Sequence, residues 1–220
     1  MKILKLIGEY LGENTYLLEK EGKILVIDPG ASAERIFSAA KALGGEIVAA
    51  ILTHGHADHA LGAAGLKKGG VPIWISEKEI DLLNGRANLA LALGFSFEKI
   101  DGVCLWKGEN PLVLPPFSIE VIETPGHTAG GVCYLIEGSL FSGDTLFCLS
   151  YGNVNFPTGD EQDLLCSIAN ELFELPDETP VYCGHSNDLP AKELAPGLFE
   201  AAPDTKIGTE KVCNPILDLL

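Results

Sequence analysis

Short apolar runs separated by turn residues recur along the whole chain. Residues 23–27 and 47–52 are two such runs, and a proline-glycine turn follows the first, so both predict strands. Between them Ser32 can cap a helix that extends to Leu43, because apolar side chains recur there on one face. The first fifty residues therefore predict a strand, a helix and a second strand, in that order.

The same alternation of strands and helices continues toward the C-terminus. Further strands are predicted at residues 73–75, 112–114, 117–122, 132–136, 140–141 and 181–182. Helices are predicted over residues 58–66, 77–83, 89–93 and 160–175. An α/β domain built in layers accounts for this order. Residues 187–203 carry several prolines without strong periodicity, which predicts an irregular segment.

Length and composition fit one globular domain. The chain has 220 residues, of which 46% are apolar and 21% charged, enough to bury a single large core. No apolar run approaches the roughly 20 residues of a membrane span, and the N-terminus lacks a secretory signal pattern, so a cytoplasmic protein is expected. The six cysteines include no Cys-x-x-Cys pair and are expected to be thiols that pack as small apolar side chains.

The charge balance narrows the range of partners. Thirty-one acidic residues against fifteen basic ones give a formal charge of −16. Such a protein repels nucleic-acid phosphates and anionic membranes, so neither is expected as a partner. A small-molecule substrate is the expected partner instead. No segment of the sequence identifies an interface between two copies of the chain. A homodimer is one alternative for the oligomeric state.

Three of the five histidines lie within six residues. His54, His56 and His59 come directly after the predicted strand at residues 47–52, and Asp58 lies among them. Imidazole and carboxylate groups are the usual ligands of zinc, iron and manganese. The His-x-His spacing lets two rings converge on one ion, while Asp58 and His59 can face a second position. A solvated histidine-rich turn is disfavoured, because alanine, leucine and glycine follow the cluster and predict a packed helix start.

Two more histidines and one aspartate occupy comparable positions. His127, Asp144 and His185 each follow a predicted strand and a glycine. Active-site side chains in α/β proteins are typically presented by short loops at strand ends. We therefore expect all five histidines and Asp144 to contribute to one site.

Four short motifs follow one another along the chain. They are Thr53-His54-Gly55-His56-Ala57-Asp58-His59, Pro125-Gly126-His127-Thr128, Ser142-Gly143-Asp144 and Gly184-His185. In this order they resemble the motifs of the metallo-β-lactamase superfamily, and the chain looks most like its glyoxalase II-like members, the hydroxyacylglutathione hydrolases. The resemblance covers nearly the whole chain. It implies a four-layer αβ/βα sandwich in a single domain, residues 1–220, with similar halves at about 1–116 and 117–220.

The resemblance also implies seven metal ligands around two divalent ions. The first ion would be held by His54, His56 and His127. The second would be held by Asp58, His59 and His185, with Asp144 as a bridge. Zinc is the first expectation, with iron and manganese as alternatives. A hydroxide bound between the ions would attack a thioester or related acyl ester, and Asp58 would act as the catalytic residue that orients it or passes on a proton.

Recognition of the substrate is where the chain departs from its relatives. Glyoxalase II-like enzymes place a basic residue for glutathione shortly after the bridging aspartate, and Asn153 stands there instead. Asn153 is therefore the candidate substrate-binding residue. Near the C-terminus, Glu210 and Lys211 are the nearest match to the basic residues that bind glutathione. Compared with short relatives, residues 187–203 are additional sequence. They are expected to form either a lid or substrate wall, or a surface insertion.

Several other activities use the same kind of cluster. A persulfide dioxygenase would use one iron ion and oxygen, a lactonase would cleave a cyclic ester, and a scaffold would bind metal without turnover. β-Lactam hydrolysis is disfavoured by the expected cytoplasmic location and by Asp144, which stands where some β-lactamases place cysteine. Ribonuclease and DNA-processing activities fit poorly with a charge of −16.

Overall fold

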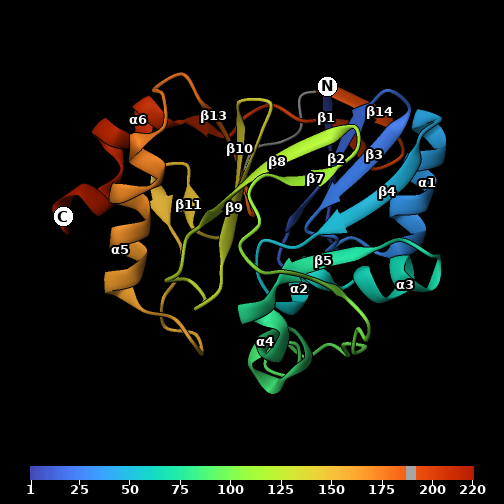
Figure 1. Ribbon diagram of the computed structural model, residues 1–220, viewed down its shortest axis with the longest axis horizontal. Helices are drawn as coiled ribbons and strands as arrows, with labels where there is room; N and C mark the ends of the chain where they lie inside the picture. The colour runs from blue at the N-terminus through green and yellow to red at the C-terminus, as the bar shows by residue number, and fades with distance from the viewer. Residues whose placement is uncertain (187–191) are drawn as a thin grey trace.

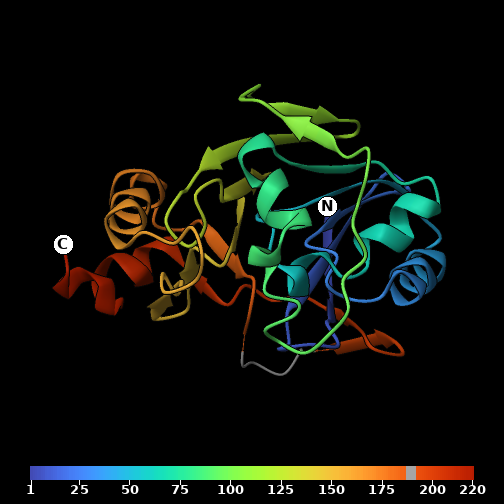
Figure 2. The same cartoon turned by 90° about the horizontal axis from the view of Figure 1, so that it is seen from below.

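Two β-sheets pack face to face, and helices cover both outer faces (Figure 1). This computed structural model describes residues 1–186 and 192–220. Figure 2 shows the same layers from below, with the orange and red helices of the C-terminal part on one side and the blue helix on the other. The predicted α/β class and the four-layer αβ/βα sandwich are confirmed.

Within the described residues, the first sheet has eight strands in the order β14-β15-β1-β2-β3-β4-β5-β6. Their bounds are Lys2–Ile7 (β1), Asn14–Lys20 (β2), Lys23–Ile27 (β3), Glu46–Ile51 (β4), Ile73–Ser76 (β5), Cys104–Trp106 (β6), Lys192–Ala195 (β14) and Leu198–Glu200 (β15). Strands β3 to β6 run parallel to one another. The carboxyl ends of β3 and β4, which precede Asp28 and His54, therefore lie at the same edge.

The second sheet has six strands in the part of the chain described, in the order β16-β13-β10-β9-β8-β7. Their bounds are Leu112–Leu114 (β7), Phe117–Glu123 (β8), Val132–Ile136 (β9), Ser139–Gly143 (β10), Pro180–Cys183 (β13) and Thr205–Lys206 (β16). Because β10 and β13 are parallel, Asp144 and His185 leave the sheet at the same end. A small hairpin follows β10, formed by Leu146–Phe147 (β11) and Ser150–Tyr151 (β12).

The helices are short and lie on the outside of the sheets or at the edge that carries the histidines. The α-helices are Ala33–Leu43 (α1), Ala57–Ala60 (α2), Ala63–Lys68 (α3), Ile80–Asn84 (α4), Glu161–Asn170 (α5) and Ile207–Cys213 (α6). Single 3-10 turns are Glu77–Glu79 (η1), Arg86–Asn88 (η2), Leu172–Glu174 (η3) and Pro215–Asp218 (η4). The helix predicted over residues 58–66 is thus divided between α2 and α3. The one predicted over residues 160–175 is divided between α5 and η3.

Two sequence predictions are wrong. Residues 89–93 form turns, not a helix, because Leu89 takes a left-handed backbone conformation with φ of 68° after η2. A five-residue apolar segment is too short to sustain a helix on its own. Residues 187–203 are not irregular throughout, because β14 and β15 form a hairpin that pairs with β1. Residues 187–191 of that prediction lie outside the described residues.

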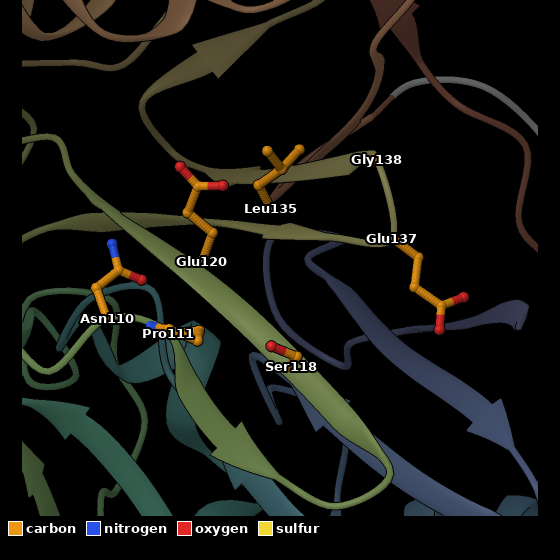
Figure 3. A pocket seen from close by; sticks show the side chains of 7 residues that line it. All are labelled: Asn110, Pro111, Ser118, Glu120, Leu135, Glu137 and Gly138. Atoms are coloured by element: carbon orange, nitrogen blue, oxygen red, sulfur yellow. The ribbon is translucent and has the colours of Figure 1, made fainter.

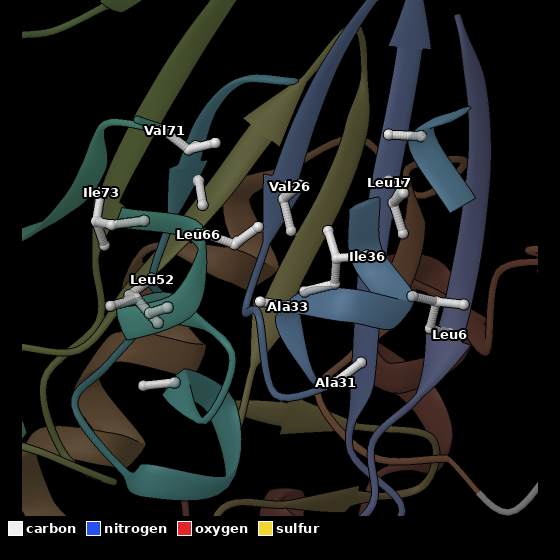
Figure 4. Packing of buried hydrophobic residues seen from close by; sticks show 14 of the residues in the cluster. Leu6, Leu17, Val26, Ala31, Ala33, Ile36, Leu52, Leu66, Val71 and Ile73 are labelled. Carbon is white, nitrogen blue, oxygen red and sulfur yellow. The ribbon is translucent and has the colours of Figure 1, made fainter. Parts of the chain in front are cut away.

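Three apolar layers hold the sandwich together. The middle layer lies between the sheets and includes Phe141 of β10, whose ring stacks on Tyr182 and meets Tyr16 edge-on. A second layer joins the first sheet to its helices, and Figure 4 shows Ile36 of α1 facing Val26 of β3 and its neighbours. The third layer joins the second sheet to α5 and α6. Burial of these side chains supplies the main favourable term in folding.

The cysteines follow the sequence expectation only in part. Cys133 and Cys183 are buried, and burial raises the pKa of both thiols, so they pack as unreactive apolar side chains. Cys148, Cys166 and Cys213 are exposed and do not pack in this way.

No helix among the described residues has the length and apolar character needed to cross a membrane.

We predict that Phe141→Ala lowers the free energy of unfolding by about 3–5 kcal/mol, because the ring is 1% exposed between the two sheets. Phe37→Ala is the matched control, because the Phe37 ring on α1 is 38% exposed. Its expected loss is about 1 kcal/mol or less. Urea unfolding followed by circular dichroism measures both. Equal losses would contradict the assignment of the middle layer as the core.

Candidate metal centre

Seven side chains of metal-binding type meet at one edge of the sandwich, where β4, β8, β10 and β13 end. They are the residues singled out from the sequence: His54, His56, Asp58, His59, His127, Asp144 and His185. Most are buried, with exposed fractions between 0% for His59 and 6% for Asp58. The loops that follow strands far apart in sequence therefore deliver these side chains to one place.

Three imidazole nitrogens face one another in the first group. His54 Nε2 lies 3.0 Å from His56 Nδ1, and His127 Nε2 lies 3.0 Å from the same atom. Imidazole nitrogens bind zinc at about 2.0–2.1 Å, so a tetrahedral ion holds its ligand nitrogens about 3.3 Å apart. The observed spacing is close to this value.

Hydrogen bonds to the outer nitrogens determine which ring nitrogen carries the proton. Thr53 Oγ1 donates to Asp28 Oδ2 at 2.7 Å, so it accepts from His54 Nδ1 at 3.0 Å. His127 Nδ1 donates to a backbone carbonyl in the loop after β12, 2.8 Å away. Both Nε2 atoms therefore present lone pairs to His56 Nδ1, which can satisfy only one of them with a proton. This donor set fits a metal ion, which would accept all three lone pairs.

The second group combines two imidazoles with carboxylates. His59 Nε2 and His185 Nε2 lie 3.2 Å apart, and Asp58 Oδ2 lies 3.4 Å from His185 Nε2. Asp144 Oδ1 lies 3.3 Å from His59 Nε2, and its Oδ2 lies 3.5 Å from His185 Nε2. The same Oδ2 lies 3.6 Å from His127 Nε2 of the first group. The Asp144 carboxylate thus lies between the two groups.

The two groups differ in their electrostatics. Burial lowers the pKa of His56 to about 3 and also lowers the pKa values of His54 and His127, so these rings are neutral at pH 7. Burial acts in the same direction on His185, but the Asp144 and Asp58 carboxylates together outweigh it and raise the pKa of His185 to about 10. The carboxylates of the second group therefore stabilise a positive charge beside them. A bound divalent cation would supply such a charge in place of the histidine proton.

Asp28, which lies between the predicted strand at residues 23–27 and the proline-glycine turn, supports the cluster. Its Oδ1 accepts from Thr53 N at 2.7 Å, and its Oδ2 accepts from His59 Nδ1 at 3.0 Å in addition to the Thr53 hydroxyl. Asp28 also lies in a potential metal-binding group with His54 and His59. Three donors already use its oxygens, so we interpret it as a supporting residue. The available signal was an acid directly after the strand at residues 23–27.

Glu79 is a second supporting residue that the sequence did not reveal. Its side chain is buried, with 1% exposure, and burial raises its pKa. Glu79 Oε2 accepts from Gly55 N at 2.8 Å, between the first two histidines of the cluster. Glu79 Oε1 accepts from Gly130 N at 2.7 Å, three residues after His127. One carboxylate therefore ties together two loops that carry histidines.

Glycines precede several of these side chains because there is no room for a Cβ. A Cβ on Gly184 would lie 2.3 Å from Asp144 Oδ1 and 2.9 Å from His59 Cε1. Gly143 has φ of 49°, and a Cβ there would lie 2.4 Å from Thr53 Oγ1. The glycines of the motifs thus permit the close approach of the loops.

A cavity of about 370 Å³ opens onto the cluster and is lined in part by His56, Asp58, His127, Asp144 and His185. Asn153 also lines it, but the Asn153 Oδ1 atom accepts from Asn155 N and Asn155 Nδ2, both at 2.9 Å. The carbonyl that orients His127 is the backbone oxygen of Asn153. A backbone contact of this kind has no signature in the sequence.

The C-terminal candidates for glutathione binding are engaged elsewhere. Lys211 Nζ donates to Leu175 O at 3.0 Å and pairs with Asp177 at 2.7 Å. Glu210 is fully buried and accepts from Leu149 N at 3.0 Å. Neither residue is among those lining the cavity at the cluster.

A second hollow lies beside β8 and β9 (Figure 3). Glu120 and Glu137 are among the residues that line it, and none of the histidines does. Glu137 is paired with Lys20 and with the N-terminal amino group. We therefore place the candidate site at the histidine cluster.

Comparison with known proteins agrees with this geometry. The family model of the metallo-beta-lactamase superfamily matches residues 9–185, which contain the whole cluster. The chain belongs to the metallo-beta-lactamase superfamily. A probable metallo-hydrolase of Streptococcus pyogenes is 33% identical, covering 98% of this chain and 90% of the relative. A hydroxyacylglutathione hydrolase of Haemophilus influenzae is also 33% identical, covering 91% of this chain and 90% of the relative. The predicted family is confirmed.

Two solved structures are similar to this chain over nearly their full length. The B3 metallo-beta-lactamase BLEG-1 is 30% identical with a TM-score of 0.82, covering 97% of this chain and 98% of that one. TTHA1623, solved in a di-iron-bound form, is 29% identical with a TM-score of 0.79, covering 96% and 98%. This metallo-beta-lactamase-superfamily protein is thus a metallo-hydrolase with a His/Asp cluster suited to metals. The relatives differ in their named activity and metal.

We predict that Glu79→Gln weakens metal binding about 10–100-fold, because an amide nitrogen cannot accept from a backbone N–H and one histidine loop loses its anchor. The unfolding free energy is expected to fall by about 1–3 kcal/mol. Zinc affinity is measured by competition with a chromophoric chelator. Glu123→Gln is the control, because that side chain is 49% exposed beside Lys78. A loss of stability with unchanged zinc affinity would show that Glu79 does not position the cluster.

Proposed function

We propose that this protein is a hydrolase that uses two divalent metal ions to cleave thioesters. The observation that carries the proposal is the position of Asp144. Its carboxylate lies 3.3 Å from His59 Nε2 and 3.6 Å from His127 Nε2, so it can contact an ion in either group. A scaffold without turnover would not need a cavity beside the donors.

The side chains that would hold the ions are His54, His56 and His127 for the first, Asp58, His59 and His185 for the second, and Asp144 for both. Two ions bound in this way activate water near neutral pH and polarise a substrate carbonyl. Zinc fits this donor set best. The di-iron form of TTHA1623 makes iron the leading alternative, with manganese next.

In this proposal Asp58 would handle the proton of the attacking water. It lines the cavity, and its Oδ2 lies 3.4 Å from His185 Nε2. Burial raises the pKa of Asp58, but nearby His59 and His185 together outweigh this effect and lower it, so the carboxylate is ionised at neutral pH. An ionised carboxylate at the cavity surface can accept a hydrogen bond from water and hold its proton.

The thioester assignment is supported by relatives named hydroxyacylglutathione hydrolase. A second candidate reaction, β-lactam hydrolysis, is favoured by the similarity to BLEG-1. Both reactions add water to a polarised carbonyl. A substrate panel therefore has to include both classes, together with a lactone.

We predict that the purified protein carries about two divalent ions per chain and cleaves a thioester, and that chelation abolishes this activity. His56→Ala removes a ligand of the first ion. Loss of a residue that only supports a ligand typically costs about 10–100-fold, so this variant should lose more than that in kcat/KM. Elemental analysis and a panel of thioester, lactone and β-lactam substrates measure these properties. Oxygen uptake with glutathione persulfide tests the dioxygenase alternative.

Glu123→Gln again serves as the control, and circular dichroism establishes that His56→Ala is folded. The proposal is wrong if the protein binds no metal, or if hydrolysis survives both chelation and His56→Ala. Faster turnover of the β-lactam or of the persulfide than of every thioester would replace it with the corresponding alternative.

A further inference from the structure

Apolar side chains form most of the cavity wall that does not belong to the metal cluster. They are Leu11, Leu89, Leu93, Phe147 and Phe156. The Phe156 ring lies 5.7 Å from His56 in the first group, and the Phe147 ring lies 6.2 Å from His185 in the second. An apolar surface therefore adjoins both groups. In a cavity beside a hydrolytic centre, such a surface favours an apolar part of the substrate.

Two of these leucines hold backbone conformations that leucine rarely adopts. Leu11 has φ of 56° and Leu89 has φ of 68°. Left-handed conformations are unfavourable for branched side chains and are usually filled by glycine or asparagine. Leu11 is followed by Gly12, also left-handed, in a tight turn where asparagine, aspartate or glycine normally precedes the glycine. Strain of this kind concentrates at functional sites.

Core packing does not account for Leu11. Its side chain is 62% exposed, yet it lines the cavity. Leu93 and Phe156 are likewise 39% and 38% exposed. Large apolar side chains gathered around a cavity and left in contact with solvent indicate a surface that an apolar ligand covers.

The cavity also lacks the charges that a glutathione carrier would need. Within the described residues, no lysine or arginine lines it. Glutathione carries two carboxylates, and the chain has a formal charge of −16. Recognition of an anionic carrier here would be unfavourable without a basic partner.

We propose that the cavity selects thioesters by an uncharged, apolar acyl chain and does not select them by an anionic thiol carrier. This inference rests on the proposed thioester hydrolysis. In that reaction a C–O bond forms between the acyl carbon and water and the C–S bond breaks. The sulfur leaves as a thiol with a proton from the water. The cavity volume of about 370 Å³ is near the lower end for small-molecule sites, which suits a short to medium chain.

The test compares thioesters that differ only in the acyl group. Acetyl, butyryl and hexanoyl thioesters of N-acetylcysteamine, an uncharged thiol, are assayed beside S-lactoylglutathione with the metal-loaded protein. The expected result is that kcat/KM rises about fourfold for each methylene that the cavity buries. The hexanoyl thioester should also exceed S-lactoylglutathione.

Leucine-to-glycine variants separate substrate contact from structural support. Leu89→Gly and Leu11→Gly remove the side chain and relax the left-handed backbone, so the thermal midpoint should stay within about 4 °C of the parent. The preference for hexanoyl over acetyl should fall about tenfold in each. Leu149→Gly is the matched control, because Leu149 has φ of 52° and is 48% exposed but does not line the cavity. Its selectivity should equal that of the parent.

The outcomes distinguish this inference from the function on which it rests. Metal-dependent hydrolysis with no dependence on acyl length, or with S-lactoylglutathione preferred, overturns the inference and leaves the proposed function standing. Equal loss of selectivity in Leu149→Gly also overturns it. Absence of metal-dependent hydrolysis of every thioester overturns the proposed function, and the inference with it.

Discussion

The buried carboxylate of Asp28 is the contact on which the geometry of the cluster depends. It accepts three hydrogen bonds at the point where β3 and β4 end, two from Thr53 and one from His59. Through the Thr53 hydroxyl it also sets the tautomer of His54. A buried charge is tolerated only when its lone pairs are satisfied, and these donors satisfy it. One acid therefore orients a histidine in each of the two groups.

The remaining side chains reach the cluster through the topology of the sheets. Strands β10 and β13 are parallel, so the loops that carry Asp144 and His185 leave the second sheet together. The two sheets face each other across a shared apolar layer, which brings these loops to the loop after β4 of the first sheet. Glu79 then ties the loop containing Gly55 to the loop after His127. The arrangement is fixed by packing and by hydrogen bonds that are remote in sequence.

This dependence on remote contacts explains what the sequence could and could not predict. The apolar runs predict the strands that precede His54, His127 and Asp144, and the motifs predict the family. Both signals lie in short stretches of sequence. The supporting roles of Asp28 and Glu79 depend on partners 24 to 51 residues away. The pairing of β15 with β1 was missed for the same reason. Its backbone hydrogen bonds demand no particular side-chain pattern.

The hairpin formed by β14 and β15 has a consequence for how the chain is made. It completes the outer edge of the first sheet, beside β1, although almost two hundred residues separate them along the chain. During synthesis the N-terminal strands leave the ribosome long before Leu198–Glu200 does. Until then the hydrogen-bonding groups along one side of β1 have no strand to pair with, and an open edge of this kind invites association with other chains. The newly made protein thus carries this open edge until the β14–β15 hairpin has been synthesised.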